Sequence, residues 1–158
     1  MAPAAAKVFL FAFVACLLSA AVSAVAYLDC GSTYDLLGVD FAGCEKPPCP
    51  LVAGATINVT STFYAKSASN SVQNDVYFVM NTVQLPATVT SCTCSGVDGT
   101  CVGQEGCAIA QGATMDYHAQ VLVGRGLPPV EGSLVWEMYN EVQHKIICYK
   151  VEVKIFWP

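Results

Sequence analysis

The chain has 158 residues, of which 54% are hydrophobic and only 12% are charged, and its formal net charge is −5 at pH 7. Twelve acidic residues face seven basic ones, which are scattered along the sequence. Such a chain has no basic patch for the phosphates of DNA or RNA, which excludes nucleic-acid binding.

The first 24 residues have the pattern of a secretory signal peptide. Lys7 is their only charged residue, Val8–Leu18 is an apolar core, and Val22-Ser23-Ala24 is a small-residue cleavage site. Ala24-Val25-Ala26 provides a second site, so cleavage at residue 26 is an alternative. A membrane anchor is a weaker alternative, because the apolar run is shorter than the roughly 20 residues of a spanning helix.

We therefore expect a signal peptide at 1–24 and one secreted or lumenal domain at 25–158. Without Lys7, six basic residues face twelve acidic ones, so the net charge becomes −6. Eight cysteines remain once Cys16 is removed, and an even number in an oxidising compartment predicts disulfides. On the order of a hundred pairings are open to Cys30, Cys44, Cys49, Cys92, Cys94, Cys101, Cys107 and Cys148.

The predicted elements begin with a short strand at Leu36–Phe41. The proline-rich run Cys44–Pro50 predicts a rigid turn, which a Cys44–Cys49 disulfide would fit. Asn58 begins an N-glycosylation sequon, for which the alternative is an unmodified surface asparagine. After Gly54 the pattern predicts a strand with Thr56, Asn58, Thr60 and Thr62 on its wet face and Ile57, Val59, Ser61 and Phe63 on the other.

Polar and cysteine-rich segments surround the next strand. Lys66–Asn74 is rich in Ser and Asn and predicts a hairpin loop. Val76–Val83 predicts a strand that is closed by Leu85-Pro86. Ser91–Gly106, which is rich in cysteine and glycine, predicts a cross-linked loop.

The clearest alternation lies between Ala113 and Trp136. One face of the first run is apolar, and after the breaker-rich segment Gly124–Pro129 a second apolar face begins at Leu134. We predict two antiparallel strands, joined at their Gly/Pro end, that present one inner layer. Its residues are Met115, Tyr117, Ala119, Val121, Val123, Leu134, Trp136 and Met138.

Lys145–Phe156 predicts a long, half-exposed final strand in which apolar side chains alternate with Cys148 and charged residues. The total is six or seven strands with no convincing helix in the mature chain. Turn signals at this spacing predict an all-β fold, either a sandwich or a barrel.

Catalytic and metal-binding chemistry find little support in the sequence. His118 and His144 are the only imidazoles, no Gly-x-Ser-x-Gly motif occurs, and His118 is expected on the exposed face of its strand. A zinc site at the four cysteines between residues 92 and 107 has tolerable spacing, but a secretory compartment favours disulfides. We expect no enzymatic activity, no metal and no cofactor.

Several spaced motifs resemble a known family. They are Asp29-Cys30-Gly31-Ser32, Gly43-Cys44, Pro48-Cys49-Pro50-Leu51, Gly54, Cys101 and Cys107 followed by Asp116-Tyr117, Val135-Trp136-Glu137 and Ile147-Cys148-Tyr149. In this order they resemble the ML lipid-recognition domains, and among these the Niemann-Pick type C2 sterol carriers. The resemblance covers the mature chain nearly from end to end.

The resemblance implies an immunoglobulin-like β-sandwich of two antiparallel sheets whose inner faces part to admit a lipid. It also implies the disulfides Cys30–Cys148, Cys44–Cys49 and Cys101–Cys107. Cys92 and Cys94 depart from the family pattern, so the nested pairs Cys92–Cys107 and Cys94–Cys101 are an alternative.

The resemblance further implies the lipid-binding residues. Its pocket mouth corresponds to Leu85-Pro86, Val123 and Leu127-Pro128, where two leucines stand in place of aromatic residues of the sterol carriers. The alternative is that the inner residues form an ordinary core. The full candidate set is Phe78, Met80, Leu85, Pro86, Met115, Tyr117, Val121, Val123, Leu127, Pro128, Trp136 and Tyr149.

We expect a monomeric carrier, secreted or in the lysosomal lumen, that binds a sterol or similar apolar lipid. It would pass this lipid to a membrane or a membrane receptor. One alternative is an innate-immune protein that binds bacterial lipid A, for which only Arg125 lies near the mouth as a cation. A second alternative is an extracellular carrier of fatty acids or semiochemicals.

Overall fold

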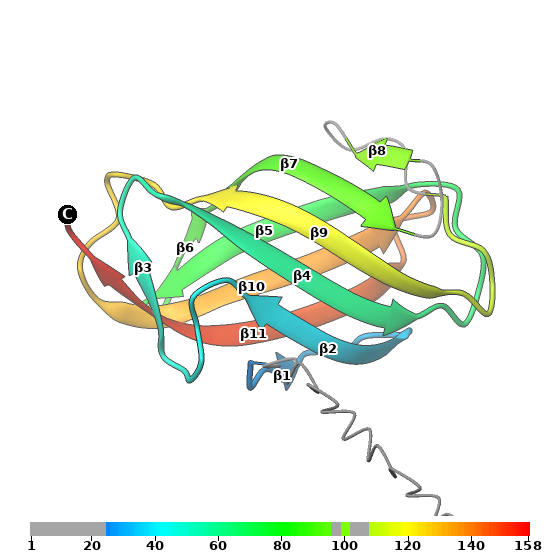
Figure 1. Ribbon diagram of the computed structural model, residues 1–158, viewed down its shortest axis with the longest axis horizontal. Helices are drawn as coiled ribbons and strands as arrows, with labels where there is room; N and C mark the ends of the chain where they lie inside the picture. The colour runs from blue at the N-terminus through cyan, green and yellow to red at the C-terminus, as the bar shows by residue number, and fades with distance from the viewer. Residues whose placement is uncertain (1–24, 96–98, 102–107) are drawn as a thin grey trace, which may run out of the picture.

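The structure, a computed structural model, describes residues 25–95, 99–101 and 108–158, with the backbone alone at 93–95 and 99–101. The predicted signal peptide lies outside these residues. Within them the chain forms eleven strands and no helix (Figure 1). The strands are β1 (Leu28–Asp29), β2 (Asp35–Phe41), β3 (Cys49–Val52), β4 (Thr56–Tyr64), β5 (Val72–Met80), β6 (Val83–Pro86), β7 (Thr88–Ser95), β8 (Gly99–Cys101), β9 (Thr114–Leu122), β10 (Glu131–Asn140) and β11 (Lys145–Phe156).

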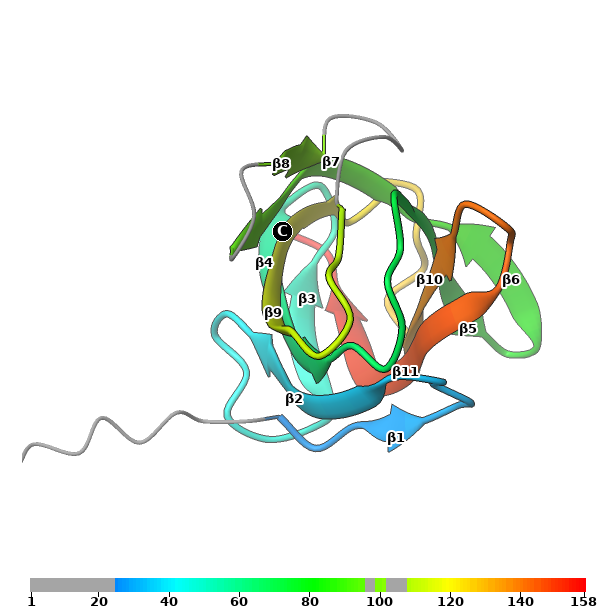
Figure 2. The ribbon, with the colours of Figure 1, turned by 90° about the vertical axis from the view of Figure 1, so that its right-hand side faces the viewer.

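The strands form two sheets that face each other, as the end-on view in Figure 2 shows. One sheet has six strands in the order β1-β11-β10-β5-β6, with β3 also paired to β11. The other has five strands in the order β2-β4-β9-β7-β8. All pairs are antiparallel except β3 with β11, a short parallel pair. The predicted immunoglobulin-like sandwich is confirmed.

Alternation along the strands decides which side chains form the core. In β9, Met115, Tyr117, Ala119 and Val121 are buried, and the residues between them are exposed. The inner-facing residues of β10 and β11 are buried in the same way, including Trp136 and Tyr149 at 0% exposure. The predicted inner layer is therefore confirmed.

The pairing predicted for the two central strands is wrong. β9 pairs with β4 and β7, whereas β10 pairs with β5 and β11. Residues 123–130 therefore cross from one sheet to the other. Residues 65–71 likewise link β4 to β5 in the opposite sheet, so the hairpin loop predicted at 66–74 is wrong as well.

Two further expectations are corrected by the strands themselves. The strand predicted at 76–83 ends at Met80, and Asn81 and Thr82 adopt positive φ values of 47° and 72° in the tight turn to β6. β7 and β8 pair within the region predicted as a loop at 91–106. The pairing of Cys92, Cys94, Cys101 and Cys107 lies outside what the structure describes.

Two of the predicted disulfides are present. Cys44–Cys49 closes the proline-rich turn before β3, and Cys30–Cys148 ties β1 to β11 over a sequence separation of 118 residues. A bridge across such a long stretch removes much conformational freedom from the unfolded chain, about 4 to 5 kcal/mol in the chain-entropy description.

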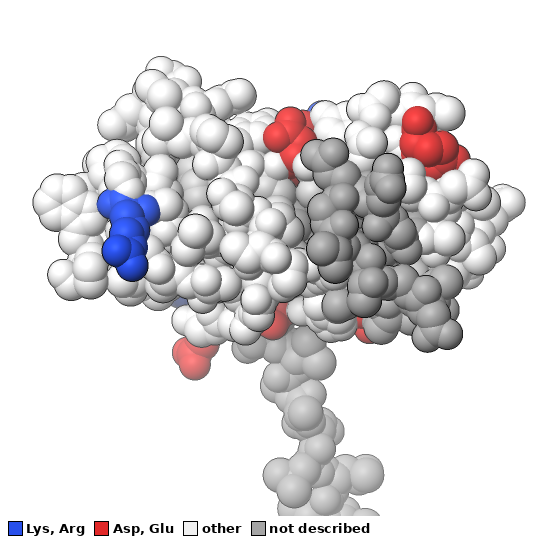
Figure 3. Space-filling view, turned by 90° about the horizontal axis from the view of Figure 1, so that it is seen from above, with Lys and Arg blue, Asp and Glu red and all other residues white. Residues whose placement is uncertain are grey.

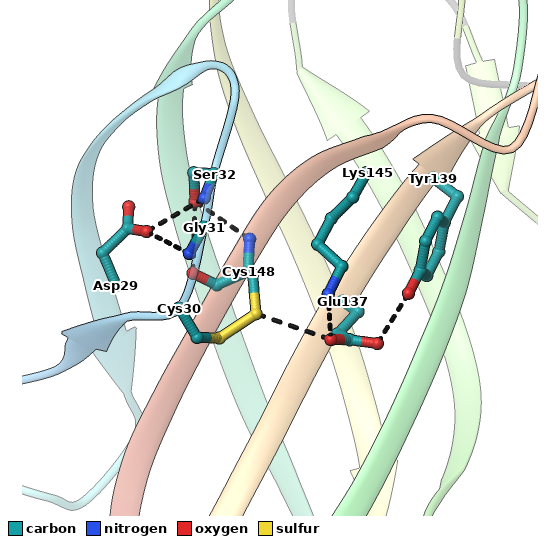
Figure 4. A network of polar contacts seen from close by, with 8 residues as sticks. All are labelled: Asp29, Cys30, Gly31, Ser32, Glu137, Tyr139, Lys145 and Cys148. Carbon is teal, nitrogen blue, oxygen red and sulfur yellow. Dashed lines mark hydrogen bonds and ion pairs between the residues drawn. A yellow bond between two sulfur atoms is a disulfide. The ribbon is translucent and has the colours of Figure 1, made fainter.

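Polar side chains surround the Cys30–Cys148 bridge on the outer face of the six-stranded sheet (Figure 4). The Ser32 hydroxyl donates to the Cys148 carbonyl at 3.1 Å and accepts from the Cys148 amide at 2.9 Å. Beside the bridge, the Glu137 carboxylate accepts hydrogen bonds from Lys145 Nζ at 2.5 Å and from the Tyr139 hydroxyl at 2.7 Å. These contacts join β10 to β11 next to the attachment of β1.

The Glu137 side chain is only 12% exposed, which bears on its ionisation. Burial by itself raises the pKa of this carboxyl, but the hydrogen bonds from Lys145 and Tyr139 and the charges of Lys145 and Lys150 outweigh it. The pKa therefore lies below the ordinary value of 4.5. The ionised form stabilises the folded protein, and this contribution is lost as the pH falls from 4.5 through the lowered pKa.

We predict that Glu137→Gln lowers the free energy of unfolding by about 1 to 2 kcal/mol at neutral pH, because charge-assisted hydrogen bonds are lost. Urea titrations should show this difference shrinking as the pH falls from 4.5 through the lowered pKa of Glu137, because the wild-type carboxyl then also becomes protonated. The matched control is Glu131→Gln, which removes the exposed ion pair with Lys154 and should cost less than about 1 kcal/mol. A Glu137→Gln effect that is independent of pH would contradict the assignment.

Candidate functional site

Aromatic side chains meet in the middle of the sandwich. Trp136 of β10 stacks on Tyr149 of β11, with ring centroids 6.1 Å apart and an interplanar angle of 12°. Tyr117 of β9 approaches Trp136 edge-on from the opposite sheet at 6.2 Å. These contacts form because β10 and β11 place Trp136 and Tyr149 directly opposite each other on the inner face.

The polar atoms of these rings are hydrogen-bonded to the side chains of Ser61 and Asn74. Tyr149 donates or accepts a 2.8 Å hydrogen bond with the Ser61 hydroxyl of β4, and both side chains are buried. Asn74 of β5 donates to the Tyr117 hydroxyl at 2.5 Å and accepts from Trp136 Nε1 at 3.0 Å. Burial raises the pKa of Tyr149, so its hydroxyl stays protonated. Two of these bonds, Ser61–Tyr149 and Asn74–Tyr117, join the two sheets.

The half of the interior toward residues 124–130 is apolar. Val121 and Val123 face it from β9 and its end, and Phe78 and Met80 face it from β5. Leu127, 7% exposed, closes it from the segment between the sheets. Further buried side chains of this half are Phe41, Val59, Ala119, Leu134, Val151, Val153 and Ile155.

A lateral cleft runs along one open side of the sandwich, between β5 and the β6–β7 segment. Its volume is about 580 Å³, and its lining mixes apolar and polar residues, namely Asn74, Asp75, Val76, Pro86, Ala87, Thr88, Val89, Thr90, Ser91 and Cys92. Leu85, Ala87 and Val89 pack against the core from this side. Figure 3 views the molecule from above, on the side that carries β7, and shows few charged side chains on that face. The cleft lies beside the apolar half, and Asp75 is the charged residue of its lining.

The structure brings most of the predicted lipid-binding residues together. Buried in the interior are Phe78, Met80, Met115, Tyr117, Val121, Val123, Leu127, Trp136 and Tyr149. The mouth residues lie at the rim, with Leu85 half-buried and Pro86 and Pro128 exposed. Met115 is separated from the others by Tyr117 and Trp136, because it lies near the opposite end of β9.

The sequence reasoning missed Asn74, because it assigned this residue to a loop. Counting back by two from Val76 along β5 places Asn74 on the inner face, where a lone polar side chain among Val72, Val76 and Phe78 is a detectable signal. Ser61 was predicted on the inner face of its strand but not as part of the site, and its bond to Tyr149 depends on the packing of the two sheets.

The end of the sandwich near residues 124–130 carries a second hollow, of about 630 Å³. It is lined by Val52, Gly54, Arg125 and Trp157. Trp157 Nε1 donates to the Leu127 carbonyl at 3.1 Å, which fixes this segment beside the mouth. Arg125 is the cation at this end that has no ion pair among the described residues, since Lys154 pairs with Glu131.

No arrangement for metal or membrane insertion was found in the described ranges. No group of three or more His, Cys, Asp or Glu side chains there could hold a metal ion, and no helix there is long and apolar enough to cross a bilayer. The zinc alternative at residues 92–107 falls largely outside these ranges. His118 is exposed and bonds Thr60 at 3.0 Å, as expected for a surface strand residue.

The described residues thus form a disulfide-tied β-sandwich with an apolar interior and a cleft along one side. The family model of the ML domain matches residues 24–155, so the chain belongs to this family. It is 24% identical over 146 residues to the NPC intracellular cholesterol transporter 2 of Bos taurus, covering 92% of this chain and 94% of the relative.

A second relative is the NPC intracellular cholesterol transporter 2 homolog a of Drosophila melanogaster, 26% identical over 152 residues, covering 92% of this chain and 97% of that protein. Among solved structures, a Niemann-Pick type C2 protein from the Japanese carpenter ant has the same fold. Its TM-score is 0.65 at 22% identity, covering 83% of this chain and 99% of that one.

Met80, one of the predicted lining residues, packs where Gly132 of β10 leaves room. A Cβ at Gly132 would overlap Met80 Sδ and the Val79 carbonyl oxygen. We predict that Gly132→Ala lowers the free energy of unfolding by about 1 to 3 kcal/mol, because overpacking must push β5 from β10. Gly38→Ala in β2 is the control: a Cβ there meets nothing within 4 Å, and the change should stay within about 0.5 kcal/mol. Equal urea midpoints for both variants would contradict the predicted overpacking at Gly132.

Proposed function

We propose that the protein is a lipid carrier that shields a sterol or similar apolar lipid between its two sheets. The observation that carries the proposal is the wholly apolar half of the interior beside the lateral cleft. The lipid-binding residues would be Phe78, Met80, Leu85, Pro86, Val121, Val123, Leu127 and Pro128, with Tyr117, Trp136 and Tyr149 deeper inside. Both relatives described above bear the name of a cholesterol transporter, which supports the same class of ligand.

The closed interior agrees with this mechanism. An empty chamber of about 300 Å³, the low end for ligand sites, would cost about 7 kcal/mol at ~24 cal/mol per Å³. That is comparable to the whole stability of a domain. The unliganded protein therefore keeps its sheets packed together, and a ligand must part them. Burial of apolar ligand surface then contributes a favourable free energy of roughly 25 cal/mol per Å².

Binding and release then need no chemical step. The carrier makes and breaks no covalent bond, requires no cofactor, and would act as a monomer that hands its lipid to a membrane or a membrane receptor. Processing at residue 24, secretion and lysosomal delivery fit the signal pattern and the two disulfides. Asn58 lies on the exposed face of β4, where a glycan would point away from the interior.

The ligand class depends on the rim. Leu85 and Leu127 keep the mouth apolar without ring stacking, so flexible fatty acids are the second candidate beside sterols. Lipid A is expected to bind less well, because its phosphates need several cations. The described rim offers Arg125, and Lys154 is already paired with Glu131.

Val121→Phe tests the proposal, because it fills the apolar half from β9, where Val121 is 0% exposed. We expect at least a tenfold loss of affinity for a labelled sterol or palmitic acid, measured by native mass spectrometry and by fluorescence competition. Leu122→Phe is the matched control, since Leu122 is 36% exposed on the outer face of the same strand. Binding by Val121→Phe as tight as wild type would refute a site between the sheets, and failure of the wild type to bind any lipid would refute the carrier.

A further inference from the structure

Five side chains form a continuous layer across the sandwich, here called the cross-sheet band: Ser61, Asn74, Tyr117, Trp136 and Tyr149. They share one cross-section because Ser61 and Tyr117 are register partners in one sheet, as are Trp136 and Tyr149 in the other. Asn74 of β5 is the register partner of Met138, two residues along β10 from Trp136, and it reaches Trp136 Nε1 at 3.0 Å. Hydrogen bonds of 2.8 and 2.5 Å close the layer between the sheets.

The band divides the interior into two unequal parts. Toward residues 124–130 the facing side chains are apolar and the lateral cleft lies alongside. On the far side, Met115, Phe63 and Met138 are covered by the segments around residues 65–71 and 109–113. Tyr34 packs on Phe63 at 6.1 Å and donates to the Ser67 carbonyl at 2.6 Å, and Ser69 bridges Ile109.

The two parts of the interior differ in the free energy that is needed to separate the sheets there. Parting the sheets at the band would break the Ser61–Tyr149 and Asn74–Tyr117 bonds and leave buried polar atoms without partners, unless water followed. Parting them in the apolar half breaks only side-chain packing between facing residues such as Val121 and Leu134, which an apolar ligand restores.

We propose that the cross-sheet band is the inner end of the ligand chamber and sets the length of the lipid that this protein accepts. The inference rests on the carrier function proposed above. The polar end of the ligand stays at the solvent-facing mouth, and its apolar end abuts Trp136 and Tyr149. Met115 lies behind the band and does not contact the ligand.

The strand geometry gives the chamber a length. Six residues separate Tyr117 from Val123, which corresponds to about 20 Å at roughly 3.4 Å per residue. For straight-chain acids, affinity should rise by about fourfold per methylene while the chain still fits. It should stop rising near palmitic acid, because further methylenes remain in water.

Trp136 provides a direct readout of the ligand's inner end. The chain has two tryptophans, so Trp157→Phe leaves Trp136 of the band as the only one. This variant, with its affinity measured beside that of wild type, is titrated with palmitic acids brominated at successive carbons. Quenching should grow toward the terminal methyl. Quenching that is strongest near the carboxyl end, or equal at every position, would overturn the proposal.

Variants in the band test the length limit itself. Tyr117→Ala should shift the optimum to acids several carbons longer, whereas Tyr117→Phe, which keeps the ring and loses only its bond to Asn74, should shift it by less. Met115→Ala opens space behind the band and is the matched control, with an unchanged optimum expected. The same shift in Met115→Ala would overturn the inference while leaving the carrier function intact. If no acid or sterol binds the wild type, the length limit and the proposed carrier function are both refuted. Should Tyr117→Ala not fold, the Trp136 quenching series decides alone.

Discussion

The hydrogen bonds that cross the interior at Ser61 and Asn74 constrain everything else in this protein. A β-sandwich is held mainly by apolar burial between its sheets, which has no direction and allows the sheets to separate or slide. The bonds to Tyr149 and Tyr117 have direction, and they fix one cross-section of the sandwich. The Ser61–Tyr149 bond is buried and the Asn74–Tyr117 bond is partly buried, so breaking them costs free energy and the sheets are held together at that level.

The disulfide and the polar contacts on the outer face reinforce the same region. Cys148 lies next to Tyr149 on β11, and its bridge to Cys30 holds β1 alongside β11, the strand that carries Tyr149 of the band on its inner face. Glu137 follows Trp136 on β10 and is tied to Lys145 on β11. Rigidity thus accumulates around the band, while the apolar half depends on packing that a lipid can replace. The proposed carrier function would need both properties, because a sandwich that opened along its whole length would have no stable frame.

Much of the fold could be predicted from the sequence, for a definite reason. A period of two residues in Met115–Val123 and in β11 fixes which side chains are buried, whatever the strands pair with. The proline-rich turn placed Cys44 near Cys49 by local geometry alone. Pairing between distant segments was not local in this sense. The Gly/Pro segment after β9 looks the same whether it turns within one sheet or crosses to the other, so the predicted pair of β9 with β10 failed.

The candidate site likewise has features that depend on local sequence pattern and features that depend on contacts between distant segments. The sequence by itself determined an apolar inner layer, the cysteines that tie it, and the residues that resemble a lipid mouth, because each depends on residue type and spacing. Only the tertiary structure decided that Asn74 meets Tyr117 and Trp136, that Ser61 meets Tyr149, and that Met115 lies on the far side of Trp136 from Val121. These are contacts between segments up to 88 residues apart in the sequence, and they exist because two separately alternating sheets are packed face to face in one register.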